Sequence, residues 1–354
     1  DAQESRGLGD VYKRQVIYIS RHSHNSIPLH CNITIRHFSA DSFNPYKMLR
    51  SQIRRFSSTP SHLTNYGFVG LGQMGQHMAR HIYNKLDPND NLYVYDTVDK
   101  CSTAFYNDVT GKNPTNKGAL KTLSSLSDFS DKNMDFIVTM VPEGKHVKSV
   151  VEELVKTHKG DKKPTFIDSS TIDIPTSIQV HDTVKSSGFD FIDAPVSGGV
   201  AGARKASLSF MLSRPTHESI SPELTTLLKK MGSNIFPCGE NHGTGLAAKL
   251  SNNYLLAITN LAVADSFQLA KSFGLYLQKY AKLVAVSTGK SWASVDNCPI
   301  KGVYPENELP ADVDFAGGFV TKLTRKDLVL ATESAKFNNR FFCLLYTSPS
   351  PRDS

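Results

Sequence analysis

The chain has 354 residues and a formal net charge of +7. Its first 66 residues carry nine Lys and Arg against four Asp and Glu, whereas residues 67–342 carry thirty against twenty-eight. The main part of the chain is therefore close to neutral, which removes the main argument for a nucleic-acid partner, and no apolar run reaches the length that spans a membrane.

Both ends of the chain carry peptides that we interpret as translated sequencing adapter. Residues 5–15 read SRGLGDVYKRQ and residues 343–353 read CLLYTSPSPRD. One DNA strand can encode the first peptide, and its reverse complement in a shifted frame can encode the second. We therefore exclude residues 1–15 and 343–354 from the fold and expect the helical region before them to be cut short. The alternative is that both peptides are genuine tails.

The region before residue 65 has the composition of a leader. Residues 16–47 show no helical or strand periodicity, and we interpret them as translated sequence upstream of a start at Met48. Residues 48–64 are basic, contain Ser and lack acidic residues, which is typical of a mitochondrial transit peptide. This predicts the mitochondrial matrix as the location of the protein. The alternative is a solvated basic arm.

A dinucleotide-binding turn follows the leader. The apolar run Tyr66–Val69 leads directly into Gly70-Leu71-Gly72-Gln73-Met74-Gly75, the Gly-x-Gly-x-x-Gly pattern of a strand that turns into a helix around a pyrophosphate. A second apolar run ends in Asp96, a carboxylate suited to the ribose hydroxyls. No arginine follows Asp96 to pair with a 2′-phosphate, so the sequence predicts NAD rather than NADP as the cofactor.

Short apolar strands alternate with helical stretches from Tyr66 onward. This alternation predicts an α/β fold, a Rossmann-type doubly wound and mostly parallel sheet over residues 65–240, followed by an all-α domain over residues 241–342 that begins with one long helix. We expect polar segments at the carboxyl ends of the parallel strands to form the binding site. The predicted strands are Gly67–Val69, Leu92–Tyr95, Phe136–Met140, Thr165–Ile167, Phe189–Ile192, Leu208–Leu212 and an edge strand at Asn234–Phe236. The five cysteines show no metal-ligand spacing, so we expect reduced thiols and no metal.

Two segments carry residues suited to acid–base chemistry on a carboxylic acid. In the first, Ser197-Gly198-Gly199 offers a hydroxyl beside exposed backbone N–H groups that can hold a carboxylate, although an ordinary strand-to-helix turn has the same pattern. In the second, Lys249 and Asn253 lie on one face of the predicted long helix. Apolar neighbours favour partial burial of Lys249, which lowers a lysine pKa toward the range of a general acid or base. The alternative is a solvated lysine.

These segments together resemble the β-hydroxyacid dehydrogenases over residues 66–335. The resemblance rests on the Gly70–Gly75 turn, on Asp193–Gly199, on Gly243–Asn253 and on Lys326-Asp327-Leu328, which occur in the family's order. Further stretches, including Gly289–Ser294, are similar to the branch of the family that acts on 3-hydroxyisobutyrate. The helical domain of the family also takes part in association, so the resemblance implies a homo-oligomer for a full-length chain.

The resemblance implies NAD-dependent oxidation of (S)-3-hydroxyisobutyrate to methylmalonate semialdehyde, a step of valine catabolism. Lys249 is then the general acid/base, and Asn253 with Ser197–Gly199 binds the substrate. Val141, Pro142, Thr171, Lys326 and His146 are then cofactor residues, although His146 stands where the family often has asparagine and can equally lie in solvent. Two alternatives stay open: a related dehydrogenase or aldehyde reductase acting on 3-hydroxypropionate, glyoxylate or succinic semialdehyde, and a non-catalytic dinucleotide-binding module.

Overall fold

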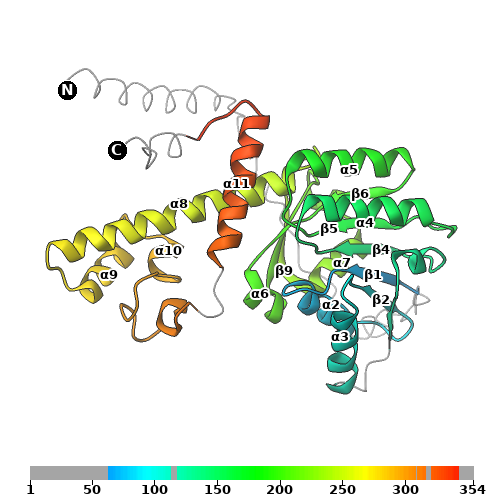
Figure 1. Cartoon of the computed structure of the whole chain (residues 1–354), viewed down its shortest axis with the longest axis horizontal. Helices are drawn as coiled ribbons and strands as arrows, with labels where there is room; N and C mark the ends of the chain where they lie inside the picture. The colour runs from blue at the N-terminus through cyan, green and yellow to red at the C-terminus, as the bar shows by residue number, and fades with distance from the viewer. Residues whose placement is uncertain (1–62, 113–117, 308, 316–319, 343–354) are drawn as a thin grey trace, which may run out of the picture. The chain divides into compact units, whose positions relative to one another are not determined.

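The computed structural model describes residues 63–112, 118–307, 309–315 and 320–342 (Figure 1). The predicted adapter peptides and leader lie outside these residues, as does the predicted transit peptide up to residue 62. Thr64 already belongs to the fold, because its carbonyl oxygen accepts a hydrogen bond from the Asn91 N–H at 3.0 Å. The described residues therefore overlap the predicted transit peptide at Leu63 and Thr64.

A six-stranded parallel sheet forms the centre of the first region. Its strands lie in the order β3-β2-β1-β4-β5-β6, so the chain reverses direction across the sheet between β1 and β4. This is the strand order of a doubly wound dinucleotide-binding fold, in which ligands bind where β1 and β4 end. The strands are β1 (Asn65–Val69), β2 (Asn91–Tyr95), β3 (Ala119–Thr122), β4 (Phe136–Thr139), β5 (Thr165–Asp168) and β6 (Asp190–Asp193).

Helices cover both faces of this sheet (Figure 1). Because successive side chains of a strand point to opposite faces, neighbouring residues pack against different helices. Phe68 packs with helices α2 (Gly75–Asn84), α3 (Asp99–Lys112) and α7 (Pro222–Met231), whereas the next residue, Val69, packs with α4 (Gly144–Thr157) and α5 (Ile174–Ser186). The same alternation places Ile137, Phe166 and Phe191 on the side of Val69, and Val138, Ile167 and Ile192 on the side of Phe68. Continuously apolar strands are the sequence signature of a sheet buried on both faces.

A second, three-stranded sheet follows β6 and was not separated from the first by the sequence patterns. It contains β7 (Val196–Ser197), β8 (Leu208–Leu212) and β9 (Gly232–Pro237), with β7 antiparallel to β8 and β8 parallel to β9. Helix α6 (Gly199–Lys205) connects β7 to β8. The predicted strands at 208–212 and 234–236 are therefore real, but they belong to this smaller sheet.

The last described region is helical, as predicted. Helix α8 (Thr244–Ser272) is followed by α9 (Leu277–Val286), α10 (Trp292–Val295) and α11 (Thr321–Phe337). The first turns of α8 pack on the large sheet's α5 side, where α11 joins them, and its far half builds a separate apolar cluster with α9 and α10. Short 3₁₀ helices occur at Leu126–Phe129, His217–Ser219 and Pro310–Val313. None of the helices in the described part of the chain combines the length and apolarity that a membrane crossing requires.

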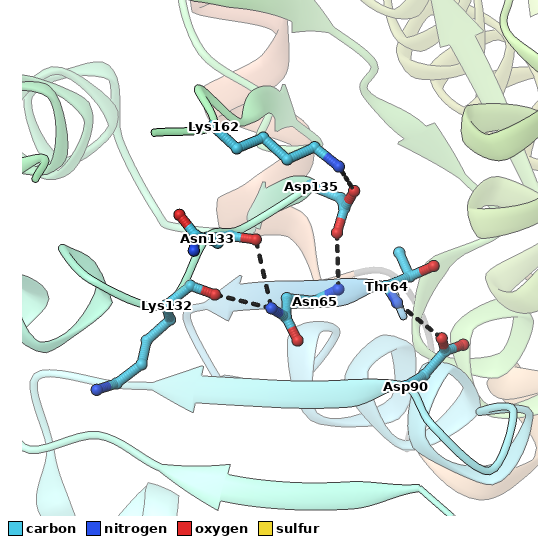
Figure 2. Close-up of polar contacts among 7 residues, drawn as sticks. All are labelled: Thr64, Asn65, Asp90, Lys132, Asn133, Asp135 and Lys162. Atoms are coloured by element: carbon cyan, nitrogen blue, oxygen red, sulfur yellow. Dashed lines mark hydrogen bonds and ion pairs between the residues drawn. The ribbon is translucent and has the colours of Figure 1, made fainter. Parts of the chain in front are cut away.

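A polar network fixes the amino end of β1, opposite the edge where the Gly-rich turn lies (Figure 2). The Asn65 N–H donates to the Asp135 carboxylate at 2.8 Å, and Lys162 forms an ion pair with the same carboxylate. The Asn65 side-chain amide donates to the Lys132 carbonyl oxygen at 2.8 Å, and the Thr64 N–H donates to Asp90 at 3.0 Å. These bonds hold β1 in register with both neighbouring strands, which in turn positions the turn at its far end.

Candidate active site

The predicted pyrophosphate turn joins β1 to α2; two of its three glycines, Gly70 and Gly75, are required sterically, and Gly72 borders open space. Gly70 has a φ of +99°, and a Cβ there would collide with the Met140 carbonyl oxygen. A Cβ on Gly75 would collide with the Gly70 carbonyl oxygen, so only glycine lets the helix start this close to the strand. A Cβ on Gly72 meets nothing within 4 Å, which leaves room for a ligand beside the backbone.

The first turn of α2 suits an anion. Met74 precedes the helix without a side-chain cap, and no acidic residue lies in the first turn. The N–H groups at a helix N-terminus point toward such a ligand and carry the positive end of the helix dipole. Leu71 and Gln73 complete the loop, with Leu71 buried and Gln73 exposed. The residues present therefore fit a pyrophosphate.

Asp96 lies at the end of β2, beside this turn. One carboxylate oxygen accepts the Leu71 N–H at 2.6 Å and the other accepts the Val98 N–H at 2.9 Å. The side chain is thus held in one orientation by the loop that it faces. Each oxygen retains a lone pair for a ribose hydroxyl, because a carboxylate can accept about four hydrogen bonds.

Lys326 on α11 joins two of the other predicted cofactor segments. Its Nζ donates to the Pro142 carbonyl oxygen at 2.9 Å and to the Thr171 carbonyl oxygen at 2.8 Å. The Pro142 carbonyl follows β4 and the Thr171 carbonyl follows β5. A further bond joins the same two segments, because the Val141 N–H donates to the Ser170 hydroxyl at 2.9 Å. Residues from three separately predicted segments therefore meet at the carboxyl edge of β4 and β5.

His146 lies in the first turn of α4 and is half-buried. Its Nδ1 is shielded from solvent and has no hydrogen-bond partner among the described residues. The contact of His146 with the cofactor stays a prediction.

Lys249 and Asn253 lie one turn apart on α8, and both are buried. Burial lowers the pKa of Lys249 below its ordinary value of 10.5, and the charge of Asp327 partly opposes this effect. Asn253 donates from its side-chain amide to the Asp327 carboxylate at 2.6 Å. Burial raises the pKa of Asp327, while the bond from Asn253 and the nearby charges of Lys249 and Lys326 act in the opposite direction.

Asp327 therefore belongs with Lys249 and Asn253, although the sequence pattern identified it only as part of the Lys326-Asp327-Leu328 motif. It follows Lys326 directly, so α11 brings one residue to the β4–β5 edge and the next to α8. Lys249 Nζ itself forms no hydrogen bond or ion pair with the residues the structure describes, which leaves its donor and acceptor capacity for a ligand.

Ser197, Gly198 and Gly199 form the junction between β7 and α6. Gly198 and Gly199 have φ values of +126° and +58°, and a Cβ on Gly199 would meet nothing within 4 Å. Ser197 is half-buried, and both glycines are exposed. Within the described ranges, no hydrogen bond joins this junction to Lys249 or Asn253, so its place in the same site stays a prediction.

Two buried aspartates at the ends of β5 and β6 were not predicted as site residues. Asp168 accepts the Thr139 hydroxyl at 2.8 Å and the Ser170 N–H at 3.1 Å with one oxygen, whereas its Oδ2 is buried without a partner in the described structure. Burial raises the pKa of Asp168 to about 6, against the effect of its bonds from Ser170 and Thr139. Its neighbour Asp193 is in register with it across the two strands. Their positions at the ends of strands were visible in the sequence, but their burial was not.

Comparison with known proteins places two family profiles on the chain. One, described as the NAD binding domain of 6-phosphogluconate dehydrogenase, matches residues 65–239. The other, described as NAD-binding of NADP-dependent 3-hydroxyisobutyrate dehydrogenase, matches residues 243–343. Together they cover more than half of the chain.

Curated relatives and a solved structure agree with these profiles. The chain is 38% identical over 286 residues to the mitochondrial 3-hydroxyisobutyrate dehydrogenase of Drosophila melanogaster, covering 80% of this chain and 82% of the relative. It is 36% identical to the corresponding protein of Mus musculus, covering 77% and 76%. The structure of Mycobacterium tuberculosis 3-hydroxyisobutyrate dehydrogenase with L-serine is similar, with a TM-score of 0.70 and 30% identity, covering 80% of this chain and 90% of that one.

Proposed function

The chain belongs to the β-hydroxyacid dehydrogenase family and carries its NAD-binding regions, and from this premise we propose that it oxidises (S)-3-hydroxyisobutyrate to methylmalonate semialdehyde with NAD⁺. The observation that carries the proposal is the buried Lys249, which lies one turn from Asn253 on α8 and whose lowered pKa reflects burial, partly opposed by the charge of Asp327. The relatives named 3-hydroxyisobutyrate dehydrogenase support the choice of substrate. L-serine, named with the solved relative, is itself a 3-hydroxy acid and supports the same substrate class.

Lys249 acts as the general base in this proposal. Its neutral amine accepts the proton of the substrate hydroxyl as the C–H bond at the same carbon breaks, and the carbonyl forms. NAD⁺ supplies the acceptor for the two electrons of that C–H bond. Because burial disfavours the charged ammonium, the neutral form is populated at a lower pH than for a solvated lysine. Turnover in the oxidation direction therefore rises with pH up to the pKa of Lys249.

Asn253 and Asp327 orient the reacting group. The Asn253 amide donates one N–H to Asp327, which fixes the direction in which its carbonyl oxygen and its second N–H point. The carbonyl oxygen of the same amide accepts the Asn252 side-chain amide at 3.2 Å, so the second N–H of Asn253 is the group that we assign to the substrate hydroxyl oxygen. The negative charge of Asp327 also stabilises the ammonium that Lys249 becomes after accepting the proton.

Ser197, Gly198 and Gly199 hold the substrate carboxylate. Both glycines have positive φ values and are exposed, so we assign their backbone N–H groups as donors to the carboxylate, and the open space above Gly199 admits a ligand. Oriented N–H groups of this kind bind anions without a charged side chain. A hydroxyl from Ser197 adds a further donor.

We further propose that NAD is preferred to NADP. The description of the second family profile names NADP. The fixed Asp96 carboxylate, however, suits two free ribose hydroxyls and would repel a 2′-phosphate, and Thr97, Val98 and Asp99 follow it without a basic residue. Thr171 and Lys326 hold the nicotinamide end of the cofactor, and Val141, Pro142 and His146 contribute at the edge of β4.

A substrate panel with both cofactors tests the proposal. Reduction of NAD⁺ and of NADP⁺ is followed with (S)- and (R)-3-hydroxyisobutyrate, 3-hydroxypropionate and L-serine, and in the reverse direction with glyoxylate and succinic semialdehyde. We expect the highest kcat/KM for (S)-3-hydroxyisobutyrate with NAD⁺. A higher value for one of the aldehydes identifies a reductase of the same fold, and NAD binding without turnover of any compound identifies a non-catalytic module.

Two further expectations concern the protein in the cell. We propose the mitochondrial matrix as its location, supported by the relatives named mitochondrial and by the basic composition of residues 48–64. We also propose a homo-oligomer formed through the helical region, since Leu261, Leu269, Phe273 and Tyr276 are exposed large apolar residues there. Light scattering after size exclusion measures the oligomeric state, and import into isolated mitochondria tests the location.

A further inference from the structure

Helix α8 begins without a cap of its own. Its N-cap residue is Gly243, which has no side chain, and the hydroxyl of the next residue, Thr244, donates back to the Asn241 carbonyl oxygen at 2.8 Å. The first N–H groups of a helix need acceptors when they are buried. A residue 50 positions earlier in the chain supplies them.

That residue is Asp193, at the end of β6. Its Oδ1 accepts the Gly243 N–H at 2.9 Å, and its Oδ2 accepts the Leu246 N–H at 3.0 Å. The side chain has no exposed surface, so both bonds are made away from water. A Cβ on Gly245 would lie 2.8 Å from Oδ2 and would collide with the Met211 carbonyl oxygen, so the helix end fits closely against the strand.

Asp193 also begins the segment that leads to Ser197. The Ala194 N–H donates to the Asp168 carbonyl oxygen at 2.8 Å, and the Met211 N–H donates to the Pro195 carbonyl oxygen at 3.0 Å. The backbone between Asp193 and the Ser197–Gly199 junction is thus attached to both sheets. In the other direction, Lys249 lies three residues beyond Leu246, which is about 4.5 Å along a helix axis.

We infer that Asp193 is a positioning residue for the reaction: by anchoring the start of α8 to the end of β6, its carboxylate sets the distance between Lys249 and the Ser197–Gly199 junction. The inference rests on the proposed function, in which these two groups hold the hydroxyl and the carboxylate of one substrate. A shift of about 1 Å in such a pair costs about a hundredfold in rate.

The test is Asp193→Asn in the full chain. The amide keeps the volume of the side chain and one acceptor oxygen, but its NH₂ group then faces an N–H of α8. We expect kcat for (S)-3-hydroxyisobutyrate to fall by about tenfold to a hundredfold, with the KM for NAD⁺ changed less than about twofold.

The control is Ser221→Ala, which removes the side-chain cap of α7 and leaves α8 untouched. In the unmodified chain, Ser221 Oγ accepts the Leu224 N–H at 3.1 Å. We expect it to lower the melting temperature without lowering kcat.

Amide hydrogen exchange of the peptide covering residues 241–250 gives a readout that does not depend on activity. We expect faster exchange there in Asp193→Asn and no change in Ser221→Ala. Unchanged exchange overturns the anchor, and faster exchange with normal kcat overturns the positioning role. If the unmodified chain oxidises no 3-hydroxy acid, the proposed function fails, and the exchange result still decides whether Asp193 anchors the helix.

Discussion

Replacement of Asp168 by asparagine separates the charge of this buried group from its shape. The carboxyl is buried, its Oδ2 has no partner among the described residues, and its pKa is raised from 3.8 to about 6. Between these two values the folded state binds more protons than the unfolded state, so the free energy of unfolding falls as pH rises. The difference of about two pKa units corresponds to about 3 kcal/mol, lost progressively as pH rises from about 4 to about 7.

The pH dependence gives the decisive comparison. A little under half of that loss, on the order of 1 kcal/mol, falls between pH 5 and pH 7.5 for a group with these two pKa values. An asparagine side chain has no such term, and its oxygen can still accept the bonds from Thr139 and Ser170. We therefore expect the stability of Asp168→Asn relative to the unmodified protein to increase by about 1 kcal/mol from pH 5 to pH 7.5. Costs that do not depend on pH cancel in this difference.

Urea denaturation followed by circular dichroism at the two pH values measures the effect. Thr139→Ser is the matched control. It leaves the Asp168 carboxyl in place and keeps the hydroxyl that donates to it. We expect the control to show no pH-dependent change relative to the unmodified protein. A relative stability of Asp168→Asn that is the same at both pH values would refute the reasoning, because it would mean that the carboxyl ionises normally in the fold.

Three other changes test separate parts of the structure. Asp96→Ala removes the carboxylate held against Leu71, and we expect the ratio of kcat/KM for NAD⁺ over NADP⁺ to fall by about tenfold or more, as one to three kcal/mol of lost contacts predicts; an unchanged ratio contradicts the cofactor assignment. Lys326→Met keeps the apolar stem but loses the bonds to two backbone carbonyls, and we expect the Kd for NADH, measured by fluorescence, to rise by about tenfold. Asp135→Ala leaves the Asn65 N–H without its acceptor, and we expect the free energy of unfolding to fall by about 1–3 kcal/mol. A fall below about 0.5 kcal/mol would mean that the network in Figure 2 does not hold β1.

The parts of the fold with a continuous apolar pattern were predictable from the sequence. β1, β2, β4, β5 and β6 are buried on both faces, so each forms an uninterrupted apolar run bounded by polar residues. β3 was missed because it is short, carries the sequence ALKT and lies at the sheet's edge with three of its four residues exposed. β7 has two residues and no pattern at all. The division into two sheets depends on pairing between distant segments, which periodicity within one segment does not contain.

The candidate site shows the same limit. The Gly70–Gly75 turn and Asp96 are tied to local geometry, and they were recognisable from spacing. The contact of Lys326 with Pro142 and Thr171 joins residues 184 and 155 positions apart, and only the docking of α11 creates it. Asp193 and Asp327 were passed over as members of motifs, because their importance lies in the groups that they bind. The position of Asp193 at the end of an apolar strand was visible in the sequence, whereas Asp327 lies within helix α11 and has no such signal.

The most direct test of the proposed mechanism is the turnover of Lys249→Met with (S)-3-hydroxyisobutyrate and NAD⁺, measured together with the Kd for NADH. Methionine keeps the apolar stem and removes the only group to which we assign proton transfer. We expect kcat to fall by about a thousandfold, within the range typical for loss of a general base, while the Kd for NADH stays within about threefold because the Gly-rich turn and Asp96 are unchanged. Turnover close to that of the unmodified chain would contradict the account.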